Sequence, residues 1–195
     1  MERHPGLRDA LHFLLFVGLV FVGVIIINSF IFRSFNVVGR SMETTLNNGD
    51  RLIVNRLPVT ISNLKNQSYK PNRGDIIVFK NPQFVQGNRD EYIVKRVIAF
   101  AGERVVVKDG KITVYNNEHP EGFNPDTLPT GGTPGSPTSG EKDEIVADNT
   151  IFVSGDHRQG NYSYDSRSGL GTIPLYDIVG PVSMRLWPIT KVKTF

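Results

Sequence analysis

The 195-residue sequence contains no cysteine, so disulfide bonds, a cysteine nucleophile and any cysteine-based metal site are excluded. Its four histidines (His4, His12, His119 and His157) lack the spacing of metal ligands, and we expect no metal site. The net charge is only +3, and no basic run is long enough to form a patch. The sequence therefore does not indicate a nucleic-acid partner.

One long hydrophobic run lies near the N-terminus. Residues 10–32 are almost entirely apolar, and about 20 such residues are enough to span a bilayer as a helix. The run is apolar on every face, unlike an amphipathic core helix, and it is longer than the apolar region of a cleavable signal sequence. We therefore predict an uncleaved transmembrane anchor over residues 10–32, preceded by a short tail of residues 1–9. Arg3 and Arg8 favour a cytoplasmic N-terminus and a translocated C-terminal domain.

Short runs rich in β-branched residues follow the anchor and predict a mostly β domain over residues 33–195. Strands are expected at residues 51–54, 75–79, 92–100, 150–153 and 178–187, the last of them broken by Gly180-Pro181. Residues 105–115 predict a hairpin with a two-residue Asp109-Gly110 turn. Residues 116–149 lose this periodicity, and residues 129–140 are all Pro, Gly, Ser or Thr, so we predict a flexible insertion without chemistry.

A turn-like stretch, residues 37–46, comes directly after the anchor and presents one serine, Ser41. No G-x-S-x-G motif surrounds it, so a base for this nucleophile must come from elsewhere in the chain. Lys95 is the best candidate, because it shares a strand face with the apolar residues Ile93 and Val97. Burial on that face would lower the lysine pKa, and a neutral amine is the base that a serine nucleophile needs. The alternatives are that Lys95 extends to solvent or pairs with an acid.

A polar segment, residues 155–167, lies at the end of a predicted strand. It contains two aspartates and two arginines beside small hydroxyl side chains, which suggests a hydrogen-bonded scaffold that holds its own loop. A solvated loop without such contacts is the alternative. His157 is a second candidate base, although the residues around Ser41 are not of the type that accompanies a His-based triad.

Five motifs of the chain, in this order, resemble the boxes of the bacterial type I signal peptidase family. They are Ser41-Met42-x-x-Thr45-Leu46, Gly49-Asp50-Arg51-Leu52-Ile53-Val54, Arg73-Gly74-Asp75-Ile76-Ile77-Val78-Phe79, Lys95-Arg96-Val97-Ile98, and Gly155-Asp156-x-Arg158 with Ser163-x-Asp165-Ser166-Arg167. The resemblance covers roughly residues 10–185, including the anchor.

The resemblance implies a membrane-bound serine endopeptidase that removes N-terminal signal peptides from exported preproteins after a small residue. It implies a Ser/Lys dyad and no cofactor or metal. By position, Ser41 matches the nucleophile and Lys95 the general base. Ser163 matches the serine that orients this lysine, and Asp165 and Arg167 match the supporting ion pair.

The resemblance also implies where substrate and membrane lie. Phe35, Val37, Met42 and Val94 fall where the family lines its shallow apolar substrate pockets. The implied fold is a β-rich domain of antiparallel sheets with a large apolar surface near the membrane. The implied partners are preproteins and the lipid bilayer, either the cell membrane or a thylakoid-type membrane. The chain would cross it once, with the catalytic domain on the translocated side.

The chain departs from the family pattern at several positions. The family usually has Pro in place of Thr44, a small residue in place of Arg40 and Asn in place of His157. Members with a serine in place of Gly39 use its hydroxyl as a second oxyanion donor, which leaves the Ser41 N–H as the visible candidate here.

Further departures lie in the later boxes: residues 99–103 differ from the usual Gly-Leu-Pro-Gly-Asp, and two extra residues precede Ser163. Two alternative functions therefore stay open, a non-catalytic membrane-tethered relative and a self-cleaving Ser/Lys regulatory protease.

Overall fold

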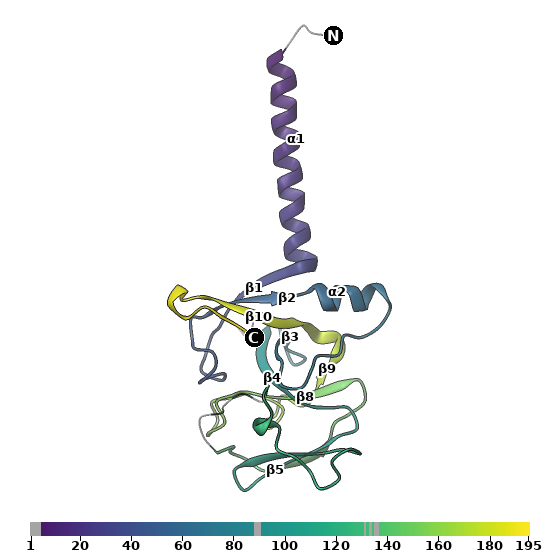
Figure 1. Cartoon of the computed structure of the whole chain (residues 1–195), viewed down its shortest axis with the longest axis vertical. Coiled ribbons are helices and arrows are strands. Elements are labelled where there is room, and N and C mark those ends of the chain that lie inside the picture. Colours follow the sequence, from purple (N-terminus) through teal and green to yellow (C-terminus); the bar gives the residue numbers. More distant parts are fainter. Residues whose placement is uncertain (1–4, 88–90, 131, 133, 135–136) are drawn as a thin grey trace.

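A long helix stands outside a β domain in the structure (Figure 1), which is a computed structural model describing residues 5–87, 91–130, 132, 134 and 137–195. Helix α1 (Pro5–Ile26) continues into the π-helical turn η1 (Ile27–Ile31), and strand β1 (Phe32–Asn36) follows with no intervening loop. The helix spanning Gly6–Ile31 has a mean hydropathy of 2.9 and its most apolar window is fully exposed, so it is long and apolar enough to cross a bilayer. The predicted helix is confirmed, but it already includes the last five residues of the expected tail, and Phe32 belongs to a strand.

The β domain contains two antiparallel sheets. The larger has the order β1-β2-β10-β3-β4-β8-β9, with β11 beside β10, and the smaller has the order β6-β5-β7. The bounds are β2 (Arg51–Asn55), β3 (Ile76–Lys80), β4 (Tyr92–Phe100), β5 (Arg104–Lys108), β6 (Lys111–Tyr115), β7 (Lys142–Ile145), β8 (Thr150–Ser154), β9 (Ile173–Pro174), β10 (Ile178–Trp187) and β11 (Lys193–Thr194). The remaining helices are α2 (Leu57–Leu64) and the 3-10 turns η2 (Pro125–Thr127), η3 (Leu175–Asp177) and η4 (Ile189–Lys191). The predicted mostly β, antiparallel fold is confirmed.

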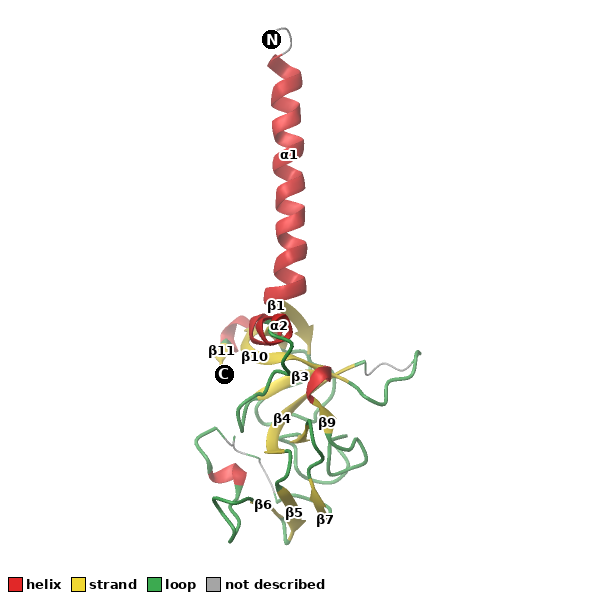
Figure 2. Cartoon of the chain, turned by 90° about the vertical axis from the view of Figure 1, so that its right-hand side faces the viewer, coloured by secondary structure: helices red, strands yellow, loops and turns green. Residues whose placement is uncertain are grey.

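The two sheets lie at different distances from α1. Helix α2 lies across the foot of α1, whereas β5, β6 and β7 lie at the far end of the domain (Figure 2). Strand β10 ties the domain together, because its first half pairs with β3 and its second half with β2. The expected break at Gly180-Pro181 is instead a register shift within a continuous strand. A Cβ at Gly180 would lie 2.2 Å from the Asn55 carbonyl oxygen, so glycine allows this close approach of strands.

The predicted hairpin is confirmed, with β5 and β6 joined by Asp109 and Gly110. Their φ angles of 51° and 77° are the positive values that a type I′ turn requires. Strand β4 is less regular than expected. Ile93 and Val97 pack in one apolar cluster, but Ala99 joins Ile98 in another because the pairing of β4 with β8 shifts register between Val97 and Ala99.

The described part of residues 116–149 is more structured than predicted. It contains η2 and strand β7, and β7 pairs with β5 along four residues. Thr138 is buried, and its N–H donates to the carbonyl of Gly110 in the hairpin turn. Long-range pairs of this kind leave no local signal in the sequence, which explains why no strand was predicted within this segment. The flexibility of the segment stays a prediction.

Glu103 joins the two sheets through a charged network. Burial raises the pKa of its carboxyl, but hydrogen bonds from Arg73, Asn116 and the Phe100 N–H outweigh this effect and hold the pKa below its usual range. A carboxyl with a lowered pKa in the folded state stabilises the fold above its unfolded pKa, and this stabilisation disappears as the pH falls through the folded pKa.

We therefore expect Glu103→Gln to lower the melting temperature at pH 7 by more than at an acidic pH below the folded pKa of Glu103, where the native carboxyl is protonated too. Thermal unfolding followed by circular dichroism at both pH values measures the difference. Glu118→Gln, which changes an exposed carboxylate, serves as the control. A loss for Glu103→Gln that is equal at both pH values would contradict this reading of the network.

Candidate active site

The structure brings Ser41 and Lys95 into contact. The Lys95 Nζ lies 2.7 Å from the Ser41 Oγ and 3.0 Å from the Val94 carbonyl oxygen. Lys95 is only 3% exposed although it lies in the middle of β4. The turn after β1 supplies the serine, and a central strand supplies the amine, from positions 54 residues apart. The pair has the hydrogen-bond geometry that a nucleophile and its base require.

A cleft of about 680 Å³ opens beside this pair. Its walls come from β1 and the following turn on one side, from the start of β4 on the other, and from two tyrosines of the 155–167 loop. Of the predicted substrate residues, Phe35, Val37 and Val94 line the cleft. Met42 does not; it is 1% exposed and lies in the apolar cluster beneath the turn, where it packs with Leu46 and other core residues.

The loop of residues 155–167 holds the backbone of the serine. The His157 N–H donates to the Ser41 carbonyl oxygen over 3.0 Å. A Cβ on Gly155 would lie 2.3 Å from that same oxygen and 2.2 Å from the Ser163 Oγ, so only glycine fits between them. The structure therefore places Ser163 close to the backbone of Ser41 in spite of the two extra residues before it.

Ser163, Asp165 and Arg167 form one buried network, as their pattern predicted. The Ser163 hydroxyl donates to Asp165 Oδ2 over 2.6 Å, and the same oxygen accepts from the Arg167 guanidinium over 2.7 Å. It also accepts from the Gly155 N–H over 2.9 Å. Asp165 is fully buried, so these donors are what keep its charge satisfied. The expected internal scaffold of this loop is confirmed.

Arg96, the neighbour of Lys95, links β4 to the 155–167 loop and to the turn of residues 37–46 that carries Ser41, here called the serine turn. It is 5% exposed, and its guanidinium contacts both carboxylate oxygens of Asp156, at 2.8 and 2.5 Å. The Thr45 hydroxyl donates to Asp156 as well. No local feature of the sequence indicates this partner of Arg96, since the two residues lie 60 positions apart.

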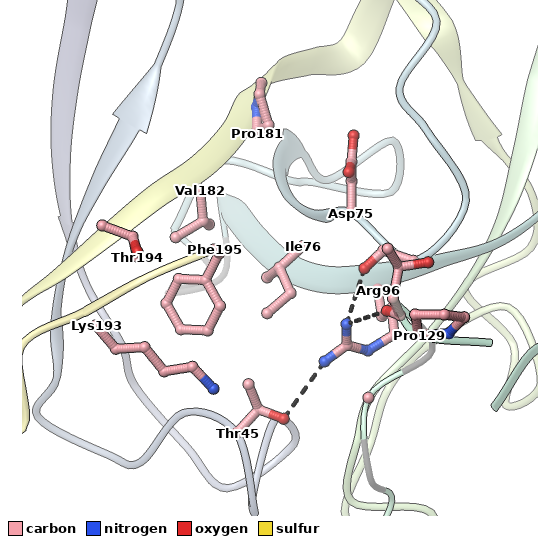
Figure 3. Close-up of a pocket in the computed structure, with 13 residues that line it drawn as sticks. Thr45, Asp75, Ile76, Arg96, Pro129, Pro181, Val182, Lys193, Thr194 and Phe195 are labelled. Atoms are coloured by element: carbon pink, nitrogen blue, oxygen red, sulfur yellow. Dashed lines mark hydrogen bonds between the residues drawn. The ribbon is translucent and has the colours of Figure 1, made fainter. Parts of the chain in front are cut away.

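A second cavity, of about 450 Å³, is lined in part by Thr45 at the end of the serine turn. Figure 3 shows Arg96 at one wall, with hydrogen bonds to Thr45 and to backbone oxygens, and the Phe195 ring beside Val182 and Ile76 at the other. Neither Ser41 nor Lys95 lines this cavity. This second cavity is therefore separate from the candidate active site.

Arg158 connects the same loop to the segment predicted to carry no chemistry. Its side chain is fully buried, and its two terminal nitrogens contact the two carboxylate oxygens of Asp126 at 2.6 Å each. The Arg158 carbonyl accepts from the Ser139 N–H, and the Arg96 guanidinium donates to the Thr130 carbonyl. Residues within 116–149 thus support two of the arginines that surround the site, a role that no local signal in the sequence predicts.

The residues of the serine turn noted above as unusual, Gly39 among them, do not disturb the contact between Ser41 and Lys95. Gly39 has a φ of 92° and donates its N–H to Asn48 Oδ1 over 2.9 Å. Within the described ranges, the Ser41 N–H donates to no protein acceptor. A free N–H at the nucleophile is what an oxyanion site needs.

His157, the second candidate base, contacts the turn but not through the serine hydroxyl. Its Nδ1 lies 3.2 Å from the Arg40 carbonyl oxygen and 3.5 Å from Glu43 Oε2, and its ring stacks on Tyr162 at 4.5 Å. These contacts place the imidazole beside Arg40 and Glu43, whereas the amine of Lys95 contacts the Ser41 hydroxyl directly.

Comparison with known proteins places the chain in a family. The family model described as "Signal peptidase, peptidase S26" matches residues 10–187. Signal peptidase IB of Staphylococcus aureus is 28% identical over 198 residues, covering 95% of this chain and 94% of its own. Signal peptidase I P of Bacillus subtilis subsp. natto is 30% identical over 164 residues, covering 84% and 81%. A crystal structure of a signal peptidase I from Enterococcus faecalis has 24% identity and a TM-score of 0.42, covering 57% of this chain and 96% of that one.

The Asp126–Arg158 pair gives a prediction that needs no substrate. Asp126→Ala leaves a fully buried guanidinium unpaired, which typically costs about 3–5 kcal/mol and should lower the melting temperature by roughly 10 °C. Amide hydrogen exchange should accelerate in residues 155–167. The control is Asp143→Ala, which breaks an Arg–Asp pair of similar geometry whose partners are about half exposed, at 52% and 53%, and should cost little. Equal effects of the two substitutions would show that Asp126 does not support the loop.

Proposed function

The chain belongs to the signal peptidase, peptidase S26, family, and on that premise we propose that it removes N-terminal signal peptides from exported preproteins with Ser41 and Lys95 as a catalytic dyad. As a member it is a serine peptidase, a hydrolase of peptide bonds. The observation that carries the assignment of the dyad is the 2.7 Å contact between the Lys95 amine and the Ser41 hydroxyl.

In the first step, the Lys95 amine accepts the proton of the Ser41 hydroxyl, and the Ser41 oxygen attacks the scissile carbonyl. Burial disfavours the charged form of a lysine, and Lys95 is 3% exposed beside the apolar residues Ile93 and Val97. The proton then passes from Lys95 to the leaving amine, which departs as the new N-terminus. Water activated by the same amine hydrolyses the acyl-enzyme and restores Ser41.

The oxyanion of the intermediate needs donors beside Ser41. The Ser41 N–H is free of protein acceptors within the described part of the chain, which supports a role as oxyanion donor. One such donor typically contributes about 3 kcal/mol to transition-state stabilisation.

Phe35, Val37 and Val94 are proposed to contact the residues before the cleaved bond. They line the cleft next to the dyad. Met42 does not line the cleft, because it is buried in the apolar cluster that supports the serine turn.

We propose that α1 holds the enzyme in the membrane with a cytoplasmic N-terminus and that the site lies close to the bilayer surface. Strand β1 starts at the end of the helix and its second half lines the cleft. Helix α2 is held to the helix end by a hydrogen bond from the Thr60 hydroxyl to the Phe30 carbonyl. Its exposed residues Leu57, Ile61 and Leu64 have the spacing of one helix face, which suits contact with lipid.

Substitutions in the dyad test the mechanism. Ser41→Ala and Lys95→Arg should each lower preprotein cleavage by at least about 1,000-fold, since one removes the nucleophile and the other replaces the base with a guanidinium that stays protonated. Wild-type activity should rise with pH as Lys95 loses its proton. Purified protein in detergent, incubated with a preprotein over a range of pH, gives these rates.

His157→Ala is the control for the choice of base. It should keep most of the activity, because the backbone N–H that holds Ser41 remains. If Lys95→Arg still cleaved preprotein and His157→Ala did not, a His-assisted mechanism would replace the dyad. Cleavage of the enzyme itself without cleavage of preprotein would favour a self-processing regulator instead.

Ser163 is proposed to orient the Lys95 amine. Ser163→Ala should lower kcat by about 10- to 100-fold with little change in KM, because the hydroxyl acts on the base and not on the substrate. Ser166→Ala provides the comparison, since its hydroxyl accepts from the Val153 N–H of β8. A loss of kcat in Ser166→Ala but not in Ser163→Ala would move this role to Ser166.

A further inference from the structure

Two chemically different groups of residues line the cleft around Ser41. One is apolar and aromatic: Phe35 lies against Tyr92, with ring centroids 5.3 Å apart, and Val94 is close by on β4. The other is polar and cationic, and consists of Arg40 and Tyr162. Arg40 contacts Glu43 and Tyr162 through its side chain and His157 through its carbonyl oxygen. Among the described residues, these hydrogen-bond, ion-pair and cation–π contacts of Arg40 include none with the Phe35 group.

We propose that Arg40 is a specificity-determining residue that binds an acidic side chain in the first two residues after the cleaved bond. The inference rests on the proposed function. A signal peptide is apolar up to its cleavage region, so it suits the Phe35 side of the cleft. The polar start of the exported protein then lies on the Arg40 side.

The guanidinium of Arg40 is available for a ligand. The side chain in its ion pair is 62% exposed, and the Nε donates to both carboxylate oxygens of Glu43 at 3.0 and 3.1 Å. Among the residues that the structure describes, the two terminal nitrogens of Arg40 donate to no protein acceptor. A guanidinium has five N–H donors, and its terminal pair matches the two oxygens of a carboxylate.

Contacts with Glu43 and with Tyr162 hold the Arg40 side chain in place relative to Ser41. Its guanidinium carbon lies 5.7 Å from the centroid of the Tyr162 ring, within cation–π range, and that ring stacks on His157. The backbone of His157 in turn holds the Ser41 carbonyl. An arginine held in this way loses less freedom when it binds a carboxylate, which favours recognition over a merely solvated charge.

The charges around this part of the cleft favour an acidic ligand. Glu43 pairs with the Nε side of Arg40, is only 24% exposed, and does not line the cleft. The acidic residue that lines the cleft, Glu91, precedes Tyr92 and so belongs to the Phe35 side. Lys95 is buried. A substrate side chain beside Arg40 therefore meets the cation first.

Three preprotein substrates that differ only in the second residue after the cleaved bond, Glu, Gln or Lys, test the proposal. With the full-length protein in detergent, kcat/KM should fall in that order, with Glu favoured over Lys by about five- to tenfold at low salt. Arg40→Gln should reduce this ratio to within about twofold, and Arg40→Glu should reverse it. Raising the salt concentration should shrink the ratio for the wild type.

Lys108→Gln is the matched control, since it removes an exposed cation in the distant small sheet and should leave the ratio unchanged. Melting temperatures show whether each variant is folded. Cleavage of all three substrates at equal rates, or an unchanged ratio in folded Arg40→Glu, would overturn this inference and leave the proposed function standing. Failure to cleave any of them would overturn the proposed function and this inference together.

Discussion

Burial of charge around β4 is the constraint on which the rest of the site depends. Three arginines, Arg96, Arg158 and Arg167, are almost completely removed from solvent, and each is paired with an aspartate. An unpaired buried charge costs several kcal/mol, so the Arg96–Asp156 and Arg158–Asp126 pairs position the segments that they join, and the Arg167–Asp165 pair holds the 155–167 loop internally. Together they fix the 155–167 loop against β4 and against residues within 116–149. That loop places Gly155 beside the Ser41 carbonyl oxygen and directs the His157 N–H to the same oxygen. These contacts set the position of the serine turn.

The same constraint explains why Lys95 can be buried next to Arg96. Adjacent residues of a strand point to opposite faces, so the guanidinium and the amine do not share one environment. Arg96 is neutralised by Asp156, whose second role is to accept from the Thr45 hydroxyl at the end of the serine turn. The partner of Arg96 therefore anchors the turn that carries Ser41, the proposed nucleophile. The dyad geometry is a consequence of this shared carboxylate as much as of β4 itself.

Local signals in the sequence predicted what is local in the structure. The Asp109-Gly110 turn, the apolar helix and the main strands all follow from spacing and composition, and the ordered motifs pointed to Ser41 and Lys95, which the structure brings into contact. What depends on distant pairing was not predictable in this way. Strand β7 exists because β5 offers it an edge, Asp126 matters because Arg158 is buried, and Ala99 changes face because of a bulge. Met42 was expected in the substrate site, but the fold of the turn directs it into the core.

The backbone of the serine turn also determines how the oxyanion can be stabilised. Gly39 adopts a φ of 92°, a conformation that other residues reach only at a cost, and its N–H is already bound to Asn48. A serine at this position would have to adopt a strained backbone before its hydroxyl could act as a donor. The turn is thus built for glycine, and a second donor cannot be gained there by a simple exchange of side chain. In the proposed mechanism the Ser41 N–H is therefore the donor to the oxyanion, and the neighbouring Arg40 is proposed to contact the substrate.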